Sequence, residues 1–270
     1  MTRPADEFEH DPEQWWTEHF EDAASIVVEF LESDDIPLEG KVVADVGSGD
    51  GIIDLGVFLK GKPAKLVGYD VRPVDVDGLL RGARAAEVAD ELPENLSFAV
   101  SKTESIPAPP DTFDVVFTWS AFEHIARPVQ VLAEIARILK PGGALFLQLW
   151  PFFKSEHGGH LWPHYEDPFP HLRRADEDIV DDVAGRRGTD PSRPADDEYR
   201  SLNRMTVEEL HRALLRTGFR VRKLHLLTHT VHVPDEVSHL SLADAGIGGI
   251  ELLASTEPQA DEPAGERRAG

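Results

Sequence analysis

The chain has 270 residues, of which 50 are acidic, 27 are lysine or arginine and none is cysteine, so its net charge at pH 7 is −23. This length suits one large α/β domain or a domain with a cap. The charge disfavours nucleic acids and anionic membranes as partners, because their phosphate groups would be repelled. No apolar run approaches the roughly 20 residues that span a bilayer. We therefore expect a cytoplasmic protein that binds neither nucleic acid nor membrane.

The first 40 residues are predicted to form a helical lid. Ala24, Val27 and Leu31 recur at three- and four-residue spacing, which places them on one face of a helix. Trp15 and Trp16 precede this helix and are candidate lid residues.

After residue 40 the sequence alternates between short apolar runs and amphipathic segments. The apolar runs predict seven strands, at 41–47, 64–71, 96–100, 113–120, 144–150, 219–233 and 249–255. Because helical segments lie between them, we predict an α/β domain over residues 41–255 with a doubly wound, mostly parallel seven-stranded sheet.

Helices are predicted at 75–90, ahead of residue 140 and after residue 206. The second has an apolar stripe and ends at the sequence Lys-Pro-Gly-Gly of residues 140–143; its stripe consists of Leu132, Ile135, Ala136 and Leu139. In the third, Thr206 and Glu209 have the spacing of a capping box. The apolar residues of that helix are Leu210, Leu214 and Leu215, and Gly218 follows it.

Residues 151–203 interrupt this alternation with a segment rich in proline, histidine, aspartate and arginine. An insertion of this length in a compact domain is typically a lid or a binding loop. We predict an inserted, loop-rich, substrate-binding cap after the fifth strand. Its aromatic residues form an apolar wall or a small core: Trp150, Phe152, Phe153, Trp162, Tyr165 and Phe169. Residues 256–270 have the composition of a disordered tail.

A glycine-rich turn follows the first strand, in the segment Asp45-Val46-Gly47-Ser48-Gly49-Asp50-Gly51. Glycine permits positive φ and close approach of a ligand, and the next helix offers free N–H groups. Asp70, at the end of the second strand, can accept hydrogen bonds from both ribose hydroxyls of a nucleoside. The spacing differs from the G-x-G-x-x-G of nicotinamide dinucleotide sites, because Ile52 follows Gly51. Asp45 would repel a pyrophosphate but suit a cationic ligand.

These motifs resemble those of the class I S-adenosylmethionine (SAM) methyltransferases. The turn at 45–51 is similar to the first motif of that family, and residues 66–70 (LVGYD) are similar to the second. Residues 113–148 are similar to the later motifs. The resemblance covers residues 38–150 and extends more loosely to 255. It implies a Rossmann-like methyltransferase fold, with SAM as methyl donor and S-adenosylhomocysteine (SAH) as product.

The resemblance also implies contacts to the cofactor. The residues that would lie along its methionine part are Asp45, Gly47, Ser48 and Gly49. Asp70 would hold the ribose, with Val71 beside the adenine. Thr103 and Glu104 belong to the loop at 101–104 that would approach the adenine ring, although Lys102 stands near the place where many relatives carry an aspartate. Trp119 and Ser120 would lie near the transferred methyl group.

Methylation of a hydroxyl requires removal of its proton during attack, whereas methylation of a neutral amine does not. Glu123 and His124 follow the fourth strand and could act as base, or could anchor the helix that follows. Farther along, Gly158 and Gly159 permit a tight turn that would bring His157 and His160 together. An imidazole has an ordinary pKa of about 6.5 and accepts protons at neutral pH. We predict His160 as the base with His157 assisting; the alternative is that these histidines order the cap.

The same segment contains nitrogen and oxygen groups that could bind a metal ion: Glu156, His157, His160, His164, Glu166 and Asp167. Their spacing matches no strong metal motif, so no metal site is predicted. If a cation does bind there, we expect Mg²⁺.

The acidic composition and the histidine-rich, aromatic cap predict an O-methyltransferase of small molecules, acting on a hydroxyl of a sugar, a glycoside or another secondary metabolite. One alternative is an N-methyltransferase of a sugar or peptide amine. Another is a non-catalytic SAM-binding partner of a second enzyme. A nicotinamide-dependent oxidoreductase is disfavoured by the glycine spacing. A homodimer through the cap or the N-terminal helix is compatible with the sequence.

Overall fold

The computed structural model describes residues 11–162, 164–184 and 195–256. Its strands are β1 (Val42–Val46), β2 (Lys65–Asp70), β3 (Leu96–Val100), β4 (Phe113–Thr118), β5 (Leu139–Leu149), β6 (Phe219–Thr228) and β7 (Ile247–Thr256). The α-helices are α1 (Pro12–Trp16), α2 (Ala24–Glu32), α3 (Ile52–Gly61), α4 (Val76–Ala85), α5 (Pro128–Ile138), α6 (Pro170–Arg173), α7 (Asp176–Ala184), α8 (Ala195–Ser201), α9 (Val207–Arg216) and α10 (Leu242–Gly246). A π-helix, η2 (Thr17–Ala23), joins α1 to α2, and two single 3₁₀ turns are η3 (Phe122–His124) and η4 (Asp235–Val237).

The strands form one seven-stranded sheet in the order β3-β2-β1-β4-β5-β7-β6. The pairs from β3 to β5 are parallel, whereas β7 is antiparallel to both β5 and β6. The predicted mostly parallel seven-stranded sheet is therefore confirmed. The predicted last-but-one strand, β6, is an edge strand and ends at Thr228, so residues 229–233 do not extend it.

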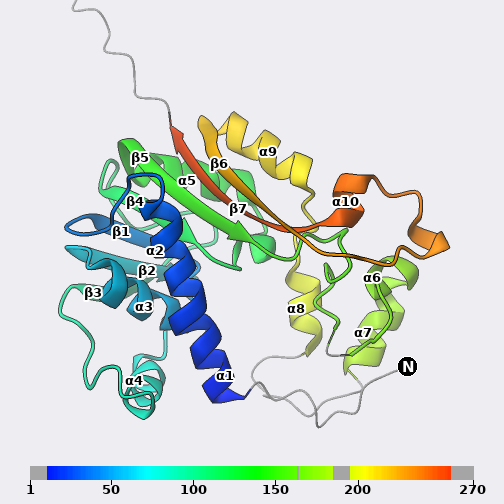
Figure 1. Cartoon of the computed structure of the whole chain (residues 1–270), viewed down its shortest axis with the longest axis horizontal. Coiled ribbons are helices and arrows are strands. Elements are labelled where there is room, and N and C mark those ends of the chain that lie inside the picture. The colour runs from blue at the N-terminus through cyan, green and yellow to red at the C-terminus, as the bar shows by residue number, and fades with distance from the viewer. Residues whose placement is uncertain (1–10, 163, 185–194, 257–270) are drawn as a thin grey trace, which may run out of the picture.

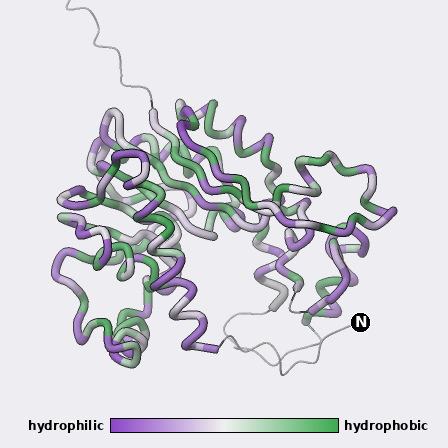
Figure 2. The backbone as a smooth tube through the Cα atoms, in the orientation of Figure 1, coloured by the Kyte–Doolittle hydropathy of each residue, from purple (hydrophilic) through white to green (hydrophobic). Residues whose placement is uncertain are grey.

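Two apolar cores lie on the two faces of this sheet. Val43 of β1 and Leu66 of β2 pack with α2 and α3, whereas Ala44 of β1 and Val67 of β2 pack with α5 and α9. Neighbouring residues of one strand point to opposite faces, which explains why these strands read as continuous apolar runs. Figure 1 shows α2 and α3 in front of the sheet and α5 behind it, and Figure 2 shows the apolar strands between more polar helices.

The start of β5 differs from the prediction. The helix α5 ends at Ile138, and Leu139 has an extended backbone and begins the strand. Residues 140–143 were expected only to stop the helix, but they lie within β5 beside a register shift between Phe113 and Val115 of β4. A bulge of this kind accommodates Pro141, which lacks an N–H group, and Gly142, whose φ is 75°.

Other helix predictions are confirmed with smaller changes. Thr206 and Glu209 form the capping box of α9, and Gly218 has φ 87° after it. Leu215 is 44% exposed, so it does not belong to the buried face that contains Leu210 and Leu214. The N-terminal helical segment runs from residue 12 to residue 32, and residues 1–10 lie outside the described residues.

The inserted segment after β5 contains the helices α6, α7 and α8, so the predicted loop-rich cap is partly helical. Figure 1 shows these helices gathered beyond the carboxyl end of β5. Tyr165 and Tyr199 help to form a small core of the cap, whereas Phe152 joins the core of the sheet and Phe169 packs with Val237.

No helix in the described ranges has the length and apolar character needed to cross a membrane. The predicted tail lies outside the described residues after Thr256.

Candidate cofactor and acceptor site

The glycine turn after β1 folds back over the end of β2. The backbone N–H groups of Gly47 and Ser48 both donate to the carbonyl of Tyr69, at 2.7 and 3.2 Å. Gly47, Gly49 and Gly51 have φ of 101°, 55° and 80°. Positive φ at three alternate positions is strained for residues with a Cβ, which is why the sequence uses glycine there.

Asp70 connects this turn to the end of β2. Its Oδ2 accepts a hydrogen bond from the N–H of Gly49 at 3.1 Å, and its Oδ1 accepts one from the N–H of Arg72 at 2.9 Å. Each carboxylate oxygen can accept a second bond. The carboxylate is therefore held in place beside the turn with acceptor capacity left for the two hydroxyls of a ribose.

Three further features of the turn and of the strand ends beside it fit SAM. Asp45 Oδ1 and Ser48 Oγ are buried without a hydrogen-bond partner among the described residues. A Cβ on Gly49 would meet no atom within 4 Å, so the turn faces open space there. Val71 and Val100, at the ends of β2 and β3, are 56% and 53% exposed and present apolar surface suited to an adenine ring. Val71 was predicted at this place; Val100 was not.

The other residues predicted to contact the cofactor lie at the same edge of the sheet. The N–H of Ser101 donates to the carbonyl of Asp70 at 2.7 Å, which places the loop of Thr103 and Glu104 after β3 next to β2. The Glu104 carboxylate pairs with Arg127 at 2.7 Å. Their contact with the adenine ring stays a prediction.

The residues after β4 are also fixed by the sheet. The N–H and Oγ of Ser120 both donate to Gln148 Oε1, at 2.8 and 3.0 Å. The Trp119 ring stacks on Phe146, with centroids 6.3 Å apart. Both therefore lie at the carboxyl ends of β4 and β5, and their predicted proximity to the methyl group stays a prediction.

Replacing Gly47 by alanine is expected to disrupt the turn. The new Cβ would overlap the Cβ of Ala121, and φ of 101° is strained for alanine. We expect a loss of about 2–4 kcal/mol in the free energy of unfolding from strain and overlap, and loss of SAH binding in calorimetry. Gly142→Ala is the matched control, because Gly142 has φ 75° with no atom near its Cβ. It should cost about 1 kcal/mol and leave SAH binding unchanged; equal behaviour of the two variants would contradict this role of the turn.

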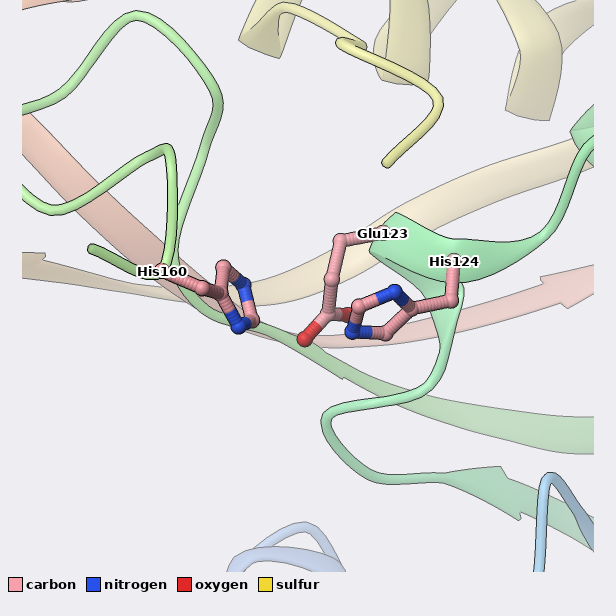
Figure 3. A group of neighbouring side chains, drawn as sticks. All are labelled: Glu123, His124 and His160. Carbon is pink, nitrogen blue, oxygen red and sulfur yellow. The ribbon is translucent and has the colours of Figure 1, made fainter. Parts of the chain in front are cut away.

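A second cluster, the acceptor cluster, brings together Glu123, His124 and His160. Glu123 and His124 lie on η3, directly after β4, and His160 lies in the loop after β5. Figure 3 shows the three side chains pointing toward one another. The rings of His124 and His160 are 5.1 Å apart at 74°, and one potential ligand atom of each of the three residues lies within 4.8 Å of the others.

The cap helix α8 holds both imidazoles of the acceptor cluster. His160 Nδ1 is 3.1 Å from Glu198 Oε1, and His124 Nδ1 is 2.7 Å from Ser201 Oγ. Asn203, after α8, donates its backbone N–H to the carbonyl of Glu123 at 2.8 Å. The cap is thus tied to the turn that contains Glu123 and His124.

Glu123 is a buried carboxyl group in this cluster. It is 4% exposed, and neither carboxyl oxygen has a hydrogen-bond partner in the described part of the chain. Burial raises the pKa of Glu123 to about 8, with a smaller contribution from the charge of Glu198. The carboxyl group is therefore mostly protonated at neutral pH.

The assistance of His160 by His157 stays a prediction, and the two side chains have different partners in the structure. The backbone turn forms as predicted, because the N–H of His160 donates to the carbonyl of His157 at 2.9 Å. The Trp162 ring is near both imidazoles, with centroid distances of 5.9 Å to His157 and 5.3 Å to His160. His157 instead stacks on His229 and lies 3.8 Å from the Glu156 carboxylate.

Among the residues that the structure describes, two groups of side chains could hold a metal ion. One is the acceptor cluster, and the other is Glu156, His157 and His229, where His229 Nε2 is 2.7 Å from Glu156 Oε2. The six candidate ligands of the sequence thus do not form a single site. Asp167, for example, pairs with Arg173 and Arg174 at 3.2 and 3.0 Å. Two imidazoles and one carboxylate suit a transition metal better than Mg²⁺, which prefers oxygen ligands.

Three residues that contact these clusters were not identified from the sequence: Glu198, Ser201 and His229. Asp54, which is buried in α3 near Asp45, was not identified either. Glu198 and Ser201 carry no local motif and lie more than 35 residues from their histidine partners. Asp54 did give a signal, because it is an acid among the apolar residues that begin α3.

The fold matches solved structures of methyltransferases. A SAM-dependent methyltransferase from Aquifex aeolicus is 18% identical, with a TM-score of 0.50 and coverage of 91% of this chain and 98% of that chain. A geranyl diphosphate methyltransferase in complex with SAM is 16% identical, with a TM-score of 0.54 and coverage of 86% and 84%. At these identities the likeness shows the fold.

The sequence comparisons agree with the fold. A ubiquinone biosynthesis O-methyltransferase of Thiobacillus denitrificans is 36% identical over 121 residues, which cover 44% of this chain and 46% of the relative. The chain thus spans about half the length of that curated relative. The family model described as a methyltransferase domain matches residues 15–224. The chain therefore belongs to the methyltransferase domain family, with the fold of the class I SAM-dependent methyltransferases.

Proposed function

We propose that this protein is a SAM-dependent O-methyltransferase that acts on a hydroxyl group of a small molecule. The observation that carries this proposal is the state of His160. Its side chain is 8% exposed, and its Nε2 is buried without a hydrogen-bond partner among the described residues. Its Nδ1 faces the Glu198 carboxylate, which can only accept a hydrogen bond. Nδ1 therefore carries the proton, and Nε2 is the nitrogen that accepts one from the substrate hydroxyl.

The residues around His160 assist proton transfer but do not accept the proton themselves. Because burial raises the pKa of Glu123 to about 8, its carboxyl is mostly neutral at pH 7 and can donate a hydrogen bond to the acceptor. His124 is oriented by Ser201, whose Oγ is 2.7 Å from its Nδ1. His157 belongs to a different group and its side chain is 38% exposed. The proposal therefore assigns proton transfer to His160 alone, with Glu123 and His124 positioning the hydroxyl.

SAM, when bound, supplies an electrophilic methyl group on a sulfonium centre. Asp70 would hold the ribose, and the glycine turn with Asp45 would hold the methionine part. The protein then has to align the hydroxyl with the methyl group and exclude water. The ordered ends of β4 and β5, with η3 and the cap around them, provide that alignment.

The acceptor is proposed to be a small hydroxylated molecule with an apolar ring. Trp150 and Trp162 lie with their rings 5.3 Å apart, and the Trp162 ring is also 5.3 Å from the His160 ring. The relative named above belongs to ubiquinone biosynthesis and is an O-methyltransferase, which supports a hydroxyl acceptor. That name gives no support to a sugar in particular, so the carbohydrate acceptor stays a prediction from the sequence.

The proposal is tested by calorimetry with SAH and by transfer of a labelled methyl group to phenols, catechols, glycosides and amines. We expect SAH to bind, methylation of a hydroxyl compound, and a change of less than about twofold after EDTA treatment, since an imidazole needs no metal to accept a proton. Transfer to amines alone would contradict the general base. Activity that EDTA abolishes and a divalent cation restores would reassign the acceptor cluster to metal binding.

A further inference from the structure

A pair of buried carboxyl groups lies under the glycine turn. Asp45, near the end of β1, is 2% exposed, and Asp54, in the first turn of α3, is fully buried. Asp45 Oδ1 and both oxygens of Asp54 have no hydrogen-bond donor among the described residues. Charged groups are rarely buried without such partners, because desolvation is costly. The proposed chemistry leaves Asp54 without a role.

The sheet register explains why these two groups meet. Asp45 is paired with Gly68 in the parallel ladder of β1 and β2, and paired residues of adjacent strands point to the same face. A Cβ on Gly68 would lie 2.6 Å from Asp54 Oδ1, so the space left by the missing side chain is filled by the Asp54 carboxyl. The two carboxyl groups are within hydrogen-bonding reach of each other on the α3 face of the sheet.

Two carboxyl groups in contact cannot both ionise easily, and a hydrogen bond between them requires a proton. Burial raises the pKa of both carboxyl groups, to about 8 for Asp54. The charge of Asp54 raises the pKa of Asp45 further, whereas the hydrogen bond with Asp45 lowers the pKa of Asp54. The charged groups that face the pair are also acidic: Asp50 from the turn and Asp70 from the end of β2. Phe98 of β3 adds an apolar neighbour. At neutral pH the pair therefore shares a proton.

We propose that the Asp45–Asp54 pair distinguishes the sulfonium donor from the thioether product by charge. This inference rests on the proposed function, in which the turn binds SAM. SAM carries one positive charge more than SAH, because methyl transfer breaks the S–C bond and leaves its electron pair on sulfur. The cation stabilises the fully ionised pair, so SAM binding releases the shared proton. After transfer the charge is gone, the pair takes up a proton from solvent, and SAH is held less tightly.

The expected effect can be stated as an affinity ratio. In an effective dielectric of about 20, two unit charges that are roughly 7 to 15 Å apart change affinity by about 6- to 50-fold. SAM affinity should therefore rise with pH until the free pair loses its proton, whereas SAH affinity should not follow. SAM and SAH carry the same α-amino and carboxylate groups, so the titration of these groups cancels in the ratio of the two dissociation constants. We expect the ratio of Kd(SAH) to Kd(SAM) to increase about sixfold or more between pH 6.5 and pH 9.

The test is titration calorimetry of the full chain with SAM and with SAH, at several pH values and in buffers of different ionisation enthalpy. The wild-type protein should release up to about one more proton with SAM than with SAH near pH 7.5. In Asp54→Asn the difference in proton release and the pH dependence of the ratio should both disappear. Glu32→Gln is the control, because it also removes one negative charge but at an exposed position, the last residue of α2.

The possible results separate this inference from the function on which it rests. If both ligands bind but release equal numbers of protons, with a ratio constant within about twofold, the discrimination by Asp45 and Asp54 is refuted and SAM binding stands. If neither ligand binds, the proposed function itself is refuted. Should Asp54→Asn fail to fold, the proton counts of the wild-type protein still decide the question.

Discussion

Replacement of His160 by glutamine is expected to lower the turnover number at least about 100-fold and leave the affinity for SAH unchanged. General bases contribute about 10²–10⁴-fold to rate. The buried Nε2 of His160, which has no hydrogen-bond partner among the described residues, is the group that would take the hydroxyl proton. The remaining activity should increase with pH, because the acceptor must then ionise without help. Single-turnover transfer of a labelled methyl group measures both effects.

Two variants make the His160 experiment specific. His157→Gln changes the neighbouring histidine of the same turn, and it should retain turnover within a few-fold because its ring lies with Glu156 and His229. Glu198→Gln keeps the hydrogen-bonding shape but removes the charge that orients His160, and it should lower turnover about tenfold. If His160→Gln loses less than about threefold, the acceptor needs no base and an amine becomes the better candidate.

Replacement of Asp70 by alanine is expected to weaken SAH binding by about 100- to 1,000-fold. Hydrogen bonds to a charged acceptor contribute about 1.5–3 kcal/mol each, and Asp70 has capacity for both ribose hydroxyls. The substitution also removes the bonds from the N–H groups of Gly49 and Arg72. Calorimetry with SAH measures the loss, and thermal unfolding shows whether the fold survives.

The ribose contact can be separated from the loosening of the turn. In the wild-type protein, SAH should bind more tightly than its 2′-deoxy form, because Asp70 accepts a bond from the missing hydroxyl. In Asp70→Asn, which keeps the shape of the side chain, this preference should shrink several-fold. An unchanged preference would mean that Asp70 supports the turn and does not contact the ribose.

The donor half of the site could be predicted because its residues are close together in the sequence. A parallel strand followed by a tight turn and a helix produces a dense local pattern, and the acid that ends β2 lies at a short distance along the chain. The length of β5 could not be predicted, because proline and glycine at 141–143 usually end an element. Only the neighbouring strand shows that they form a bulge within this one.

Only part of the acceptor half could be predicted, because its residues come from segments that are distant in the sequence. His160 and Glu123 stood out as residue types suited to proton transfer, but nothing local indicated that Glu198 and Ser201 orient the two imidazoles. His157 and His160 flank a glycine pair, which favoured a joint role. In the structure the His157 ring stacks on His229, whereas His160 faces Glu198. Such a choice of rotamer depends on packing against residues that are distant in the sequence.

The tie between α8 and η3 has a consequence for how relatives of this protein diverge. Glu198 and Ser201, which contact the two imidazoles in the described part of the chain, both belong to the insertion after β5. The predicted cofactor residues precede that insertion in the chain. Exchanging that insertion between relatives would change the preference for the acceptor and leave the residues that bind the methyl donor unchanged. Chemical diversity in such a lineage can then arise from the replacement of a single stretch of sequence.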